Sequence, residues 1–455
     1  MKPITGKIAF IAVCVLSALL INSIIDFAFG AYHNNLDIHR PTFILIMIFL
    51  ILASAVKQVL NRVMVYFWYF FYLAGLLFVN NAAVSDPKFG HLTNLGADNF
   101  FFLNLIALTC GFLVSERVWR KRNKTISIEK QARLSYPIFF LLLLYPFVFF
   151  VIIYTTLGFI PILSGESIVD DMYNLNYGGI YGFKFYVIIS ILVAIFYSFK
   201  GKRLLYILLA VVFALISLLD GKRAVLLVAV VAGLVLYYLH SVKFSRVRTG
   251  LIVLALTGAV VAYAGLAILR TGRDNELNSM TSVINKFPVG VEYADYVYSF
   301  EKFTPGSIQG YDFLKSSFGS FMNSAVLTFM GLDKEEMVAS GSAYSWMREY
   351  NSDLGIRTGI VCELYFDYGY FTLLIVFLLA FWCDYINRMI FATKDLMSFL
   401  LLLSVYGFHV LLIVGQATVY FGSLTLIVYL YFANKLFAYL SPRRYKKKAI
   451  ASNPQ

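Results

Sequence analysis

Long apolar runs alternate with short polar segments along most of the chain. A helix needs about 20 mainly apolar residues to cross the hydrocarbon core of a bilayer, and the runs reach or approach that length. The pattern therefore predicts an all-α fold, a polytopic integral membrane protein with about twelve transmembrane helices. The predicted helices are residues 8–29, 41–56, 64–82, 99–115, 137–157, 183–199, 204–219, 224–240, 250–270, 359–381, 396–415 and 417–437.

One polar interval, residues 271–358, is much longer than the others. It contains many aromatic residues, such as Phe287, Phe318 and Trp346, whereas disordered segments contain few. We expect it to form helices that lie on the outer face of the membrane and partly re-enter it around 311–330. The predicted organisation is transmembrane helices one to nine (1–270), a large periplasmic loop (271–358), transmembrane helices ten to twelve (359–437) and a basic cytoplasmic tail (438–455).

The composition supports this class, since 60% of the 455 residues are apolar and only 14% are charged. A soluble domain has roughly a quarter charged residues. A soluble enzyme, a disordered protein and a disulfide-stabilised scaffold are therefore excluded. The cysteines lie within or at the start of apolar runs and form no CxxC motif, which argues against a disulfide framework and a zinc site.

Charge predicts the orientation of the chain. With the N-terminus in the cytoplasm and the spans alternating, the inward segments hold 25 Lys and Arg but only four acids, Glu116, Glu129, Asp384 and Asp395. The outward segments hold the other 13 Lys and Arg against 20 acids. This is the positive-inside rule, so the net charge of +13 indicates a membrane partner and no nucleic acid. Both termini are predicted to be cytoplasmic, with the tail residues 443–448 held by anionic lipid.

Several arginines lie at the predicted outer ends of the late spans, where the positive-inside rule disfavours them. Taken singly, each can reach the membrane interface or pair with a nearby acid. Together they flank one loop, and the planar guanidinium group suits bidentate contacts to phosphate. We therefore expect a site for an anionic, diphosphate-bearing headgroup at the outer surface. The arginines are Arg223, Arg270, Arg273, Arg348 and Arg357.

Two carboxylates open the predicted span 359–381. Glu363 and Asp367 are four residues apart and share one helix face. Glu363 is either a general base, an organiser of one of the arginines, or an interface acid that neutralises them. Asp367 reads more simply as a neutralising acid.

The other polar features of the sequence give weaker indications of a functional site. The pairs 170–171 and 335–336 offer adjacent carboxylates to a cation, but adjacent acids in a loop are more often solvated, and we predict no metal site. His240 and His409 read as interface or packing residues. The chain has no Walker motif, GxGxxG loop or HExxH motif, so it shows no sign of cytoplasmic nucleotide chemistry, and we predict no cofactor.

The order of three short motifs resembles a known family. A Gly-Lys-Arg turn at 221–223 precedes the long loop, a span ends in Leu-Arg at 269–270, and a Gly-x-x-x-Glu-Leu-Tyr-Phe-x-x-Gly segment follows the loop at 359–369. In order and sidedness they resemble the O-antigen polymerases (Wzy) of bacterial surface-polysaccharide assembly. The resemblance covers roughly 220–375 in detail and the remainder in hydropathy.

The resemblance implies a glycosyltransferase of the bacterial inner membrane. It would move a growing glycan from undecaprenyl diphosphate onto a sugar hydroxyl of a fresh lipid-linked repeat unit at the periplasmic face. A chain-length regulator of the Wzz type would be a further partner. In these terms Arg223 and Arg270 contact the diphosphate and Glu363 is the base or organiser. The supporting residues are Arg273, Arg348, Arg357 and, for sugar positioning, Tyr344.

Three alternatives stay open. A flippase for lipid-linked sugars has a similar number of spans, but transporters place charges at the midplane and show internal repeats, neither of which is visible here. O-antigen ligases use a His in the large outward loop, and residues 271–358 contain none. A non-catalytic scaffold of an envelope complex would not need arginines clustered beside the spans.

Overall fold

The structure is a computed structural model, and every regular element that it describes is a helix. It describes residues 40–69, 71, 95–119, 134, 136–157, 185–200, 203–219, 224–240, 296–297, 299–300, 303–341, 345, 359–393, 395–413 and 417–440. No strand occurs in these ranges, so the all-helical class is confirmed. The long helices are α2 (Arg40–Ala55), α4 (Leu95–Val118), α5 (Tyr136–Leu157), α9 (Phe185–Lys200), α10 (Arg203–Leu218), α11 (Ala224–His240), α20 (Thr372–Ala392), α21 (Leu396–Leu411) and α22 (Ala417–Leu440).

These helices begin and end close to the predicted runs, with one clear exception. The predicted run 359–381 is too short, because helix α19 (Gly359–Tyr368) and the 3-10 turn η4 (Gly369–Phe371) lead directly into α20, which ends at Ala392. The predicted run ended before the polar residues of 384–388 because it was defined by apolar residues alone. The helix continues through these residues, and Asp384 forms an ion pair with Arg388. The predicted runs 8–29 and 250–270 lie outside the described residues.

Two helical stretches in the described ranges, Gly96–Val118 and Gly359–Ala392, are long and apolar enough to cross a membrane. Several shorter helices are apolar as well, and α5 and α10 carry large aliphatic side chains on their outer faces. Leu144 is 58% exposed on α5, and Leu204 is 72% exposed on α10. Soluble proteins rarely expose contiguous apolar surface of this kind, whereas a lipid-facing helix requires it.

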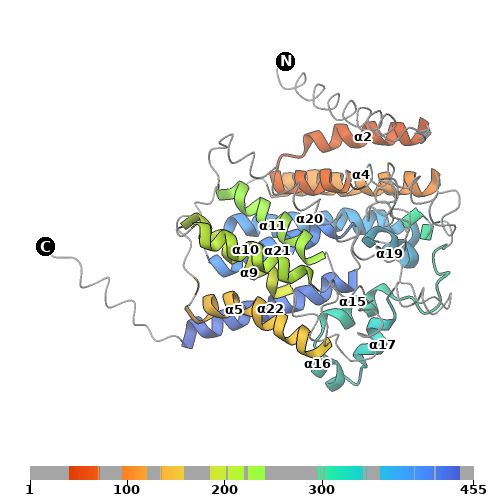
Figure 1. Cartoon of the computed structure of the whole chain (residues 1–455). Helices are drawn as coiled ribbons and strands as arrows, with labels where there is room; N and C mark the ends of the chain where they lie inside the picture. Colours follow the sequence, from red (N-terminus) through yellow and green to blue (C-terminus); the bar gives the residue numbers. More distant parts are fainter. Residues whose placement is uncertain are drawn as a thin grey trace, which may run out of the picture.

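Close contacts between helices depend on small residues. Helix α4 lies between α2 and α20 (Figure 1). A Cβ atom at Gly111 of α4 would lie 2.4 Å from the carbonyl oxygen of Phe377 in α20. A Cβ at Gly407 of α21 would lie 2.9 Å from the Val228 carbonyl oxygen in α11. Glycine at these positions therefore lets the helix backbones approach closely, as is common between membrane helices.

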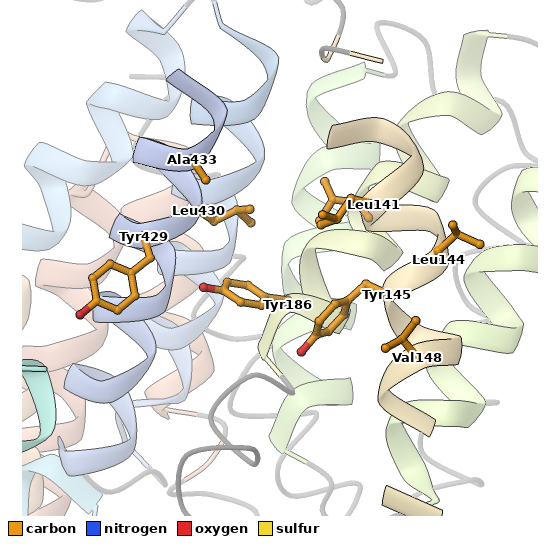
Figure 2. A pocket seen from close by; sticks show the side chains of 9 residues that line it. Leu141, Leu144, Tyr145, Val148, Tyr186, Tyr429, Leu430 and Ala433 are labelled. Carbon is orange, nitrogen blue, oxygen red and sulfur yellow. The ribbon is translucent and has the colours of Figure 1, made fainter. Parts of the chain in front are cut away.

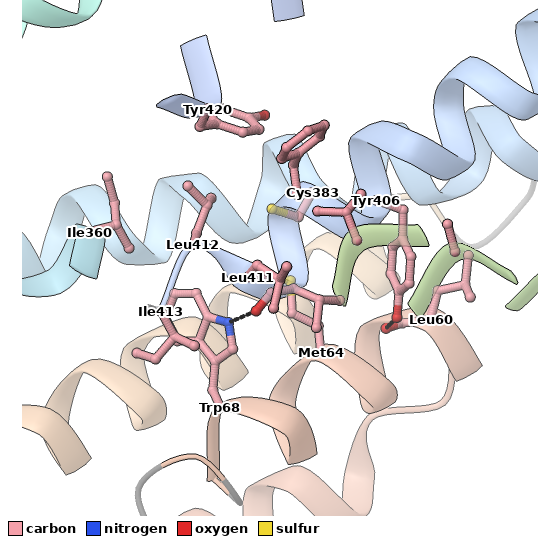
Figure 3. Packing of buried hydrophobic residues seen from close by; sticks show 14 of the residues in the cluster. Leu60, Met64, Trp68, Ile360, Cys383, Tyr406, Leu411, Leu412, Ile413 and Tyr420 are labelled. Atoms are coloured by element: carbon pink, nitrogen blue, oxygen red, sulfur yellow. Dashed lines mark hydrogen bonds between the residues drawn. The ribbon is translucent and has the colours of Figure 1, made fainter. Parts of the chain in front are cut away.

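Buried polar side chains fix one further packing contact. Residues 59–69 form a helix that packs against α21. The indole Nε1 of Trp68 donates to the Val410 carbonyl oxygen at 3.1 Å, and the Tyr406 hydroxyl donates to the Leu60 carbonyl oxygen at 3.0 Å (Figure 3). Both side chains are fully buried. Each large apolar ring is thus buried with its polar atom satisfied.

The described part of the predicted loop forms short helices, as expected. They are α15 (Phe313–Phe321), α16 (Ser324–Phe329) and α17 (Lys334–Ala339), and they gather near one end of α22 (Figure 1). The side chains of Asp312, Asn323 and Asp333 accept backbone N–H groups at the three N-termini, the usual role of such residues. Helix α15 packs on α22, where the Thr425 hydroxyl donates to the Phe321 carbonyl oxygen.

Candidate functional site

Of the residues that the sequence assigns to the site, the structure describes only Glu363. The predicted phosphate ligands and sugar contact all lie outside the described residues, namely Arg223, Arg270, Arg273, Tyr344, Arg348 and Arg357. The site can therefore be built from Glu363 and the elements that surround it.

Glu363 lies in the first turns of α19, on a segment that is buried from Gly359 to Phe366. The helix begins at Gly359, whose φ of +67° is a left-handed conformation that glycine adopts easily. The Ile360 N–H donates to the Leu412 carbonyl oxygen at 3.0 Å, which holds this helix start against the end of α21. Glu363 itself is only 3% exposed. Its carboxylate is thus inside the protein, where a charge is tolerated only with a compensating partner.

A stretch of the large loop, residues 303–313, lies across α19. The Tyr311 hydroxyl donates to the Glu363 backbone carbonyl oxygen at 2.8 Å, and the Gly306 N–H donates to the Phe366 carbonyl oxygen at 2.8 Å. Burial, together with the negative charges of Glu363 and Asp367, raises the pKa of Tyr311 well above its usual value. The Tyr311 hydroxyl therefore keeps its proton and remains a donor to α19.

Aromatic rings fill the space between α19, α4 and the start of the described loop. The ring of Tyr365 stacks on Phe300 with centroids 4.8 Å apart and also contacts Phe100 of α4 at 4.8 Å. Beside them, Tyr370 and Phe371 of η4 are 65% and 60% exposed. Exposed aromatic residues at a helix end are typical of a membrane–water interface. The N-terminal end of α4 and the loop are thus joined at one end of the helix bundle.

Asp367 forms a hydrogen bond with the start of α15 in the large loop. Its Oδ2 accepts the backbone N–H of Phe313 at 3.0 Å, and Phe313 is the first residue of α15. A carboxylate is favourable at this position because the first N–H groups of a helix have no partner within it. The prediction that Asp367 neutralises an arginine stays a prediction, since the candidate arginines lie outside the described residues. The contact that the structure describes is to a helix N-terminus.

Replacing Asp367 with alanine is expected to loosen the attachment of α15 to α19. The loss of a charged acceptor at a helix start costs about 1 kcal/mol. Hydrogen exchange of the amides in 312–316 should become several-fold faster, while exchange in α4 stays unchanged. Asp367→Asn retains an oxygen acceptor and should lie close to the unmodified protein. Equal exchange in the alanine variant and the unmodified protein would contradict this role.

The sequence analysis did not find one polar cluster that links three helices. His409 of α21 is fully buried, and its Nε2 lies 2.5 Å from the Tyr420 hydroxyl of α22. The same hydroxyl accepts the indole N–H of Trp382 in α20 at 3.2 Å. His409 is therefore a packing residue, as predicted, but it also links three helices. Only the apolar setting of His409 was visible in the sequence, because its partners come from two other spans.

Two further places in the described residues bear on ligand binding, the acidic residues of α17 and a cavity beside α22. No group of three His, Cys, Asp or Glu side chains able to hold a metal ion occurs in the ranges that are described. Glu336 pairs instead with Lys315 at 2.8 Å. A cavity of about 600 Å³ between α5, α9 and α22 is lined by aliphatic and tyrosine side chains, including Tyr145, Tyr186 and Tyr429 (Figure 2). It suits an apolar chain and has no charge for a headgroup.

Comparison with protein families shows what the chain is similar to. The family model described as O-antigen polysaccharide polymerase Wzy matches residues 8–437, nearly the whole chain. Searches of curated proteins and of solved structures return no match.

Proposed function

The chain belongs to the O-antigen polysaccharide polymerase Wzy family, and we propose that it joins lipid-linked oligosaccharide repeat units at the periplasmic face of the bacterial inner membrane. The observation that carries this proposal is the family match from residue 8 to 437, which includes the predicted spans and the large loop. The family accounts for polymerisation of O-antigen repeat units in a membrane. The undecaprenyl diphosphate carrier, the side of the membrane and the residue roles are our proposal.

In the proposed reaction the bond between the first sugar of the growing glycan and its diphosphate breaks. A hydroxyl of the fresh repeat unit forms a new glycosidic bond to the same carbon, and its proton passes to a base. The lipid diphosphate leaves with the bonding electrons, so negative charge grows on its oxygens. Fixed cations beside these oxygens lower the barrier. We assign this task to Arg223 and Arg270, with Arg273, Arg348 and Arg357 in support and Tyr344 positioning sugar.

The burial of Glu363 bears on its proposed role. A general base must come within hydrogen-bond reach of the proton that it takes. Glu363 is only 3% exposed, and the Tyr311 hydroxyl of the loop contacts its backbone carbonyl oxygen. This buried position suits a group that holds a guanidinium in place. We therefore favour Glu363 as the organiser of an arginine, and we keep the role of base as the alternative.

The contacts between helices agree with the proposed alternation of the spans, because helix ends that are predicted to share a side of the membrane contact one another. The turn after α2, the end of α4 and the end of α20 are all predicted to face the cytoplasm, and they contact one another through Glu116 and Asp384. The loop segment 303–313 and the start of α19 are predicted to face outward, and they meet at Tyr311. A Wzz-type chain-length regulator would then meet this protein from the periplasmic side.

Flippase and ligase are the two alternative activities. A flippase would move the same lipid-linked units, and a ligase would transfer finished polymer. The absence of His from 271–358 disfavours a ligase. Transporters place their charges near the bilayer midplane, whereas the candidate arginines lie at one predicted membrane face.

A strain that lacks this protein distinguishes the polymerase, flippase and ligase activities. We expect surface polysaccharide to collapse from a ladder to a single repeat unit, with single lipid-linked units accumulating on the outer face. The measurement is a ladder gel combined with mass spectrometry of lipid-linked sugars from each membrane face. Units held on the inner face would indicate a flippase, and long polymer that stays on its lipid carrier would indicate a ligase. Either result would overturn the proposal.

A further inference from the structure

A second cavity, of about 520 Å³, lies at the opposite end of α4 from the loop and α19. Its lining residues come from the end of α2 and the turn that follows, from α4 and from α20. They include Lys57, Leu113, Val114, Glu116, Arg117 and Arg388. This cavity has no place in the polymerisation proposed above.

The lining changes in chemistry along α4. Cys110, Leu113 and Val114 provide an apolar part, and Arg117 stands at the helix end. At 1.5 Å per residue, the step from Cys110 to Arg117 is about 10 Å. Lys57 of the neighbouring turn adds a second cation at the charged end. An apolar wall that leads to cations over this distance matches a lipid, whose acyl chains begin beside its phosphate.

The one carboxylate in the lining is already satisfied by the cavity wall. Glu116 accepts the backbone N–H groups of Lys57 and Gln58, each at 2.9 Å, and the Asn61 amide at 3.2 Å. Arg388 is held by Asp384 at 2.8 Å. Hydrogen bonds therefore hold the wall in place, and the Glu116 carboxylate accepts hydrogen bonds from the turn after α2.

Two cations of this cavity remain available. The side chains of Lys57 and Arg117 are exposed, and neither forms an ion pair with another residue in the described ranges. Charge patterning predicts that this end of the helices faces the cytoplasm. Basic pockets between membrane helices on that side recognise anionic lipid headgroups.

We infer that this cavity binds an anionic phospholipid of the inner leaflet. Its phosphate contacts Lys57 and Arg117, and its acyl chain lies along Leu113 and Val114. The bound lipid bridges α2 and α4 and stabilises the folded protein. A soluble phosphate compound would use the cations but not the apolar wall.

The test uses the full chain purified in detergent. Phosphatidylglycerol and phosphatidylcholine with the same acyl chains are added in turn, and retained lipid is counted by native mass spectrometry together with the melting temperature. We expect retention of phosphatidylglycerol and a rise in melting temperature that phosphatidylcholine does not produce. Neutralising both cations, as Lys57→Gln with Arg117→Gln, should weaken phosphatidylglycerol binding about tenfold or more.

A matched double variant controls for net charge. Arg203→Gln with Lys435→Gln removes two cations from the same predicted side but outside the cavity, and it should bind like the unmodified protein. Equal retention of the two lipids, or equal loss in both double variants, would overturn the inference. Glycerol 3-phosphate serves as the soluble probe. If it raises the melting temperature as much as phosphatidylglycerol, the site belongs to a soluble anion and the lipid assignment is wrong.

A third variant tests the apolar wall and does not remove charge. Cys110→Phe narrows the part assigned to the acyl chain and leaves both cations in place. It should reduce phosphatidylglycerol retention and leave glycerol 3-phosphate without effect, as in the unmodified protein. Unchanged retention in this variant would also contradict the lipid assignment.

Discussion

Replacing Asp384 with alanine is expected to lower the free energy of unfolding by about 3–5 kcal/mol, the largest effect on stability that we predict. The Asp384 carboxylate is fully buried. It accepts the Ser115 hydroxyl at 2.5 Å, the Asn61 amide at 2.8 Å and the Arg388 guanidinium at 2.8 Å. Alanine would leave three donors on different segments without their shared acceptor, one of them a positive charge that is 13% exposed.

The measurement is the melting temperature of the purified protein in detergent, together with the amount of protein in the membrane. Asp395→Ala is the matched control, since Asp395 is the same residue type on the same predicted side. It caps α21 by accepting the Ser398 N–H at 3.0 Å, and the loss of a cap costs about 1 kcal/mol. Similar melting temperatures in the two variants would show that the buried contacts of Asp384 contribute little.

A double variant separates the unpaired charge from the lost hydrogen bonds. Arg388→Met removes the charge that Asp384→Ala strands inside the protein. If that charge causes most of the loss, the double variant should be more stable than Asp384→Ala alone. Additive losses would instead assign the effect to the Ser115 and Asn61 contacts.

The Asp384 cluster also shows where sequence reasoning stops. Apolar runs predicted the described helices well, because a bilayer imposes the same length and composition on every span. The same count ended one helix at 381, because it treats Asp384 and Arg388 as breaks. Their i,i+4 spacing was a local sign of the pair. The contacts from Asn61 and Ser115 are not local, since they come from distant segments of the chain.

The loop could be predicted in character but not in detail. Its aromatic content indicated ordered structure, and Asp312 and Asp333 stand at helix starts, as capping residues do. The docking of Phe313 on Asp367 and of Tyr311 on Glu363 joins segments about 50 residues apart. Such contacts depend on tertiary packing, and no pattern along the chain encodes them.

The candidate site depends more heavily on the sequence. Glu363 was singled out by its position after the loop, and the structure adds that it is buried, which no spacing could indicate. The arginines were singled out because they oppose the positive-inside rule. Their relation to Glu363 stays a prediction, and function is the way to test it.

Neutral substitution of Arg223 or Arg270 is expected to abolish visible polymer, the largest effect on function that we predict. Removing one preorganised donor from a developing negative charge typically costs a hundredfold to a thousandfold in rate. A polymerase slowed that far would leave mostly single repeat units. Arg→Lys at either position keeps the charge and loses the planar fork, so it should retain short ladders. The measurement is a ladder gel at matched protein level.

Glu363→Gln tests the carboxylate in the same assay and distinguishes its two proposed roles. If Glu363 organises an arginine, glutamine keeps an oxygen acceptor in the same place, so activity should fall but persist, and its pH dependence should keep its shape. If Glu363 is the base, activity should fall to the level of the arginine variants. Glu336→Gln is the control, because Glu336 lies on the loop surface in an exposed pair with Lys315. Full ladders from Arg223→Ala, Arg270→Ala and Glu363→Gln would remove these residues from the site, and the family assignment would stand without them.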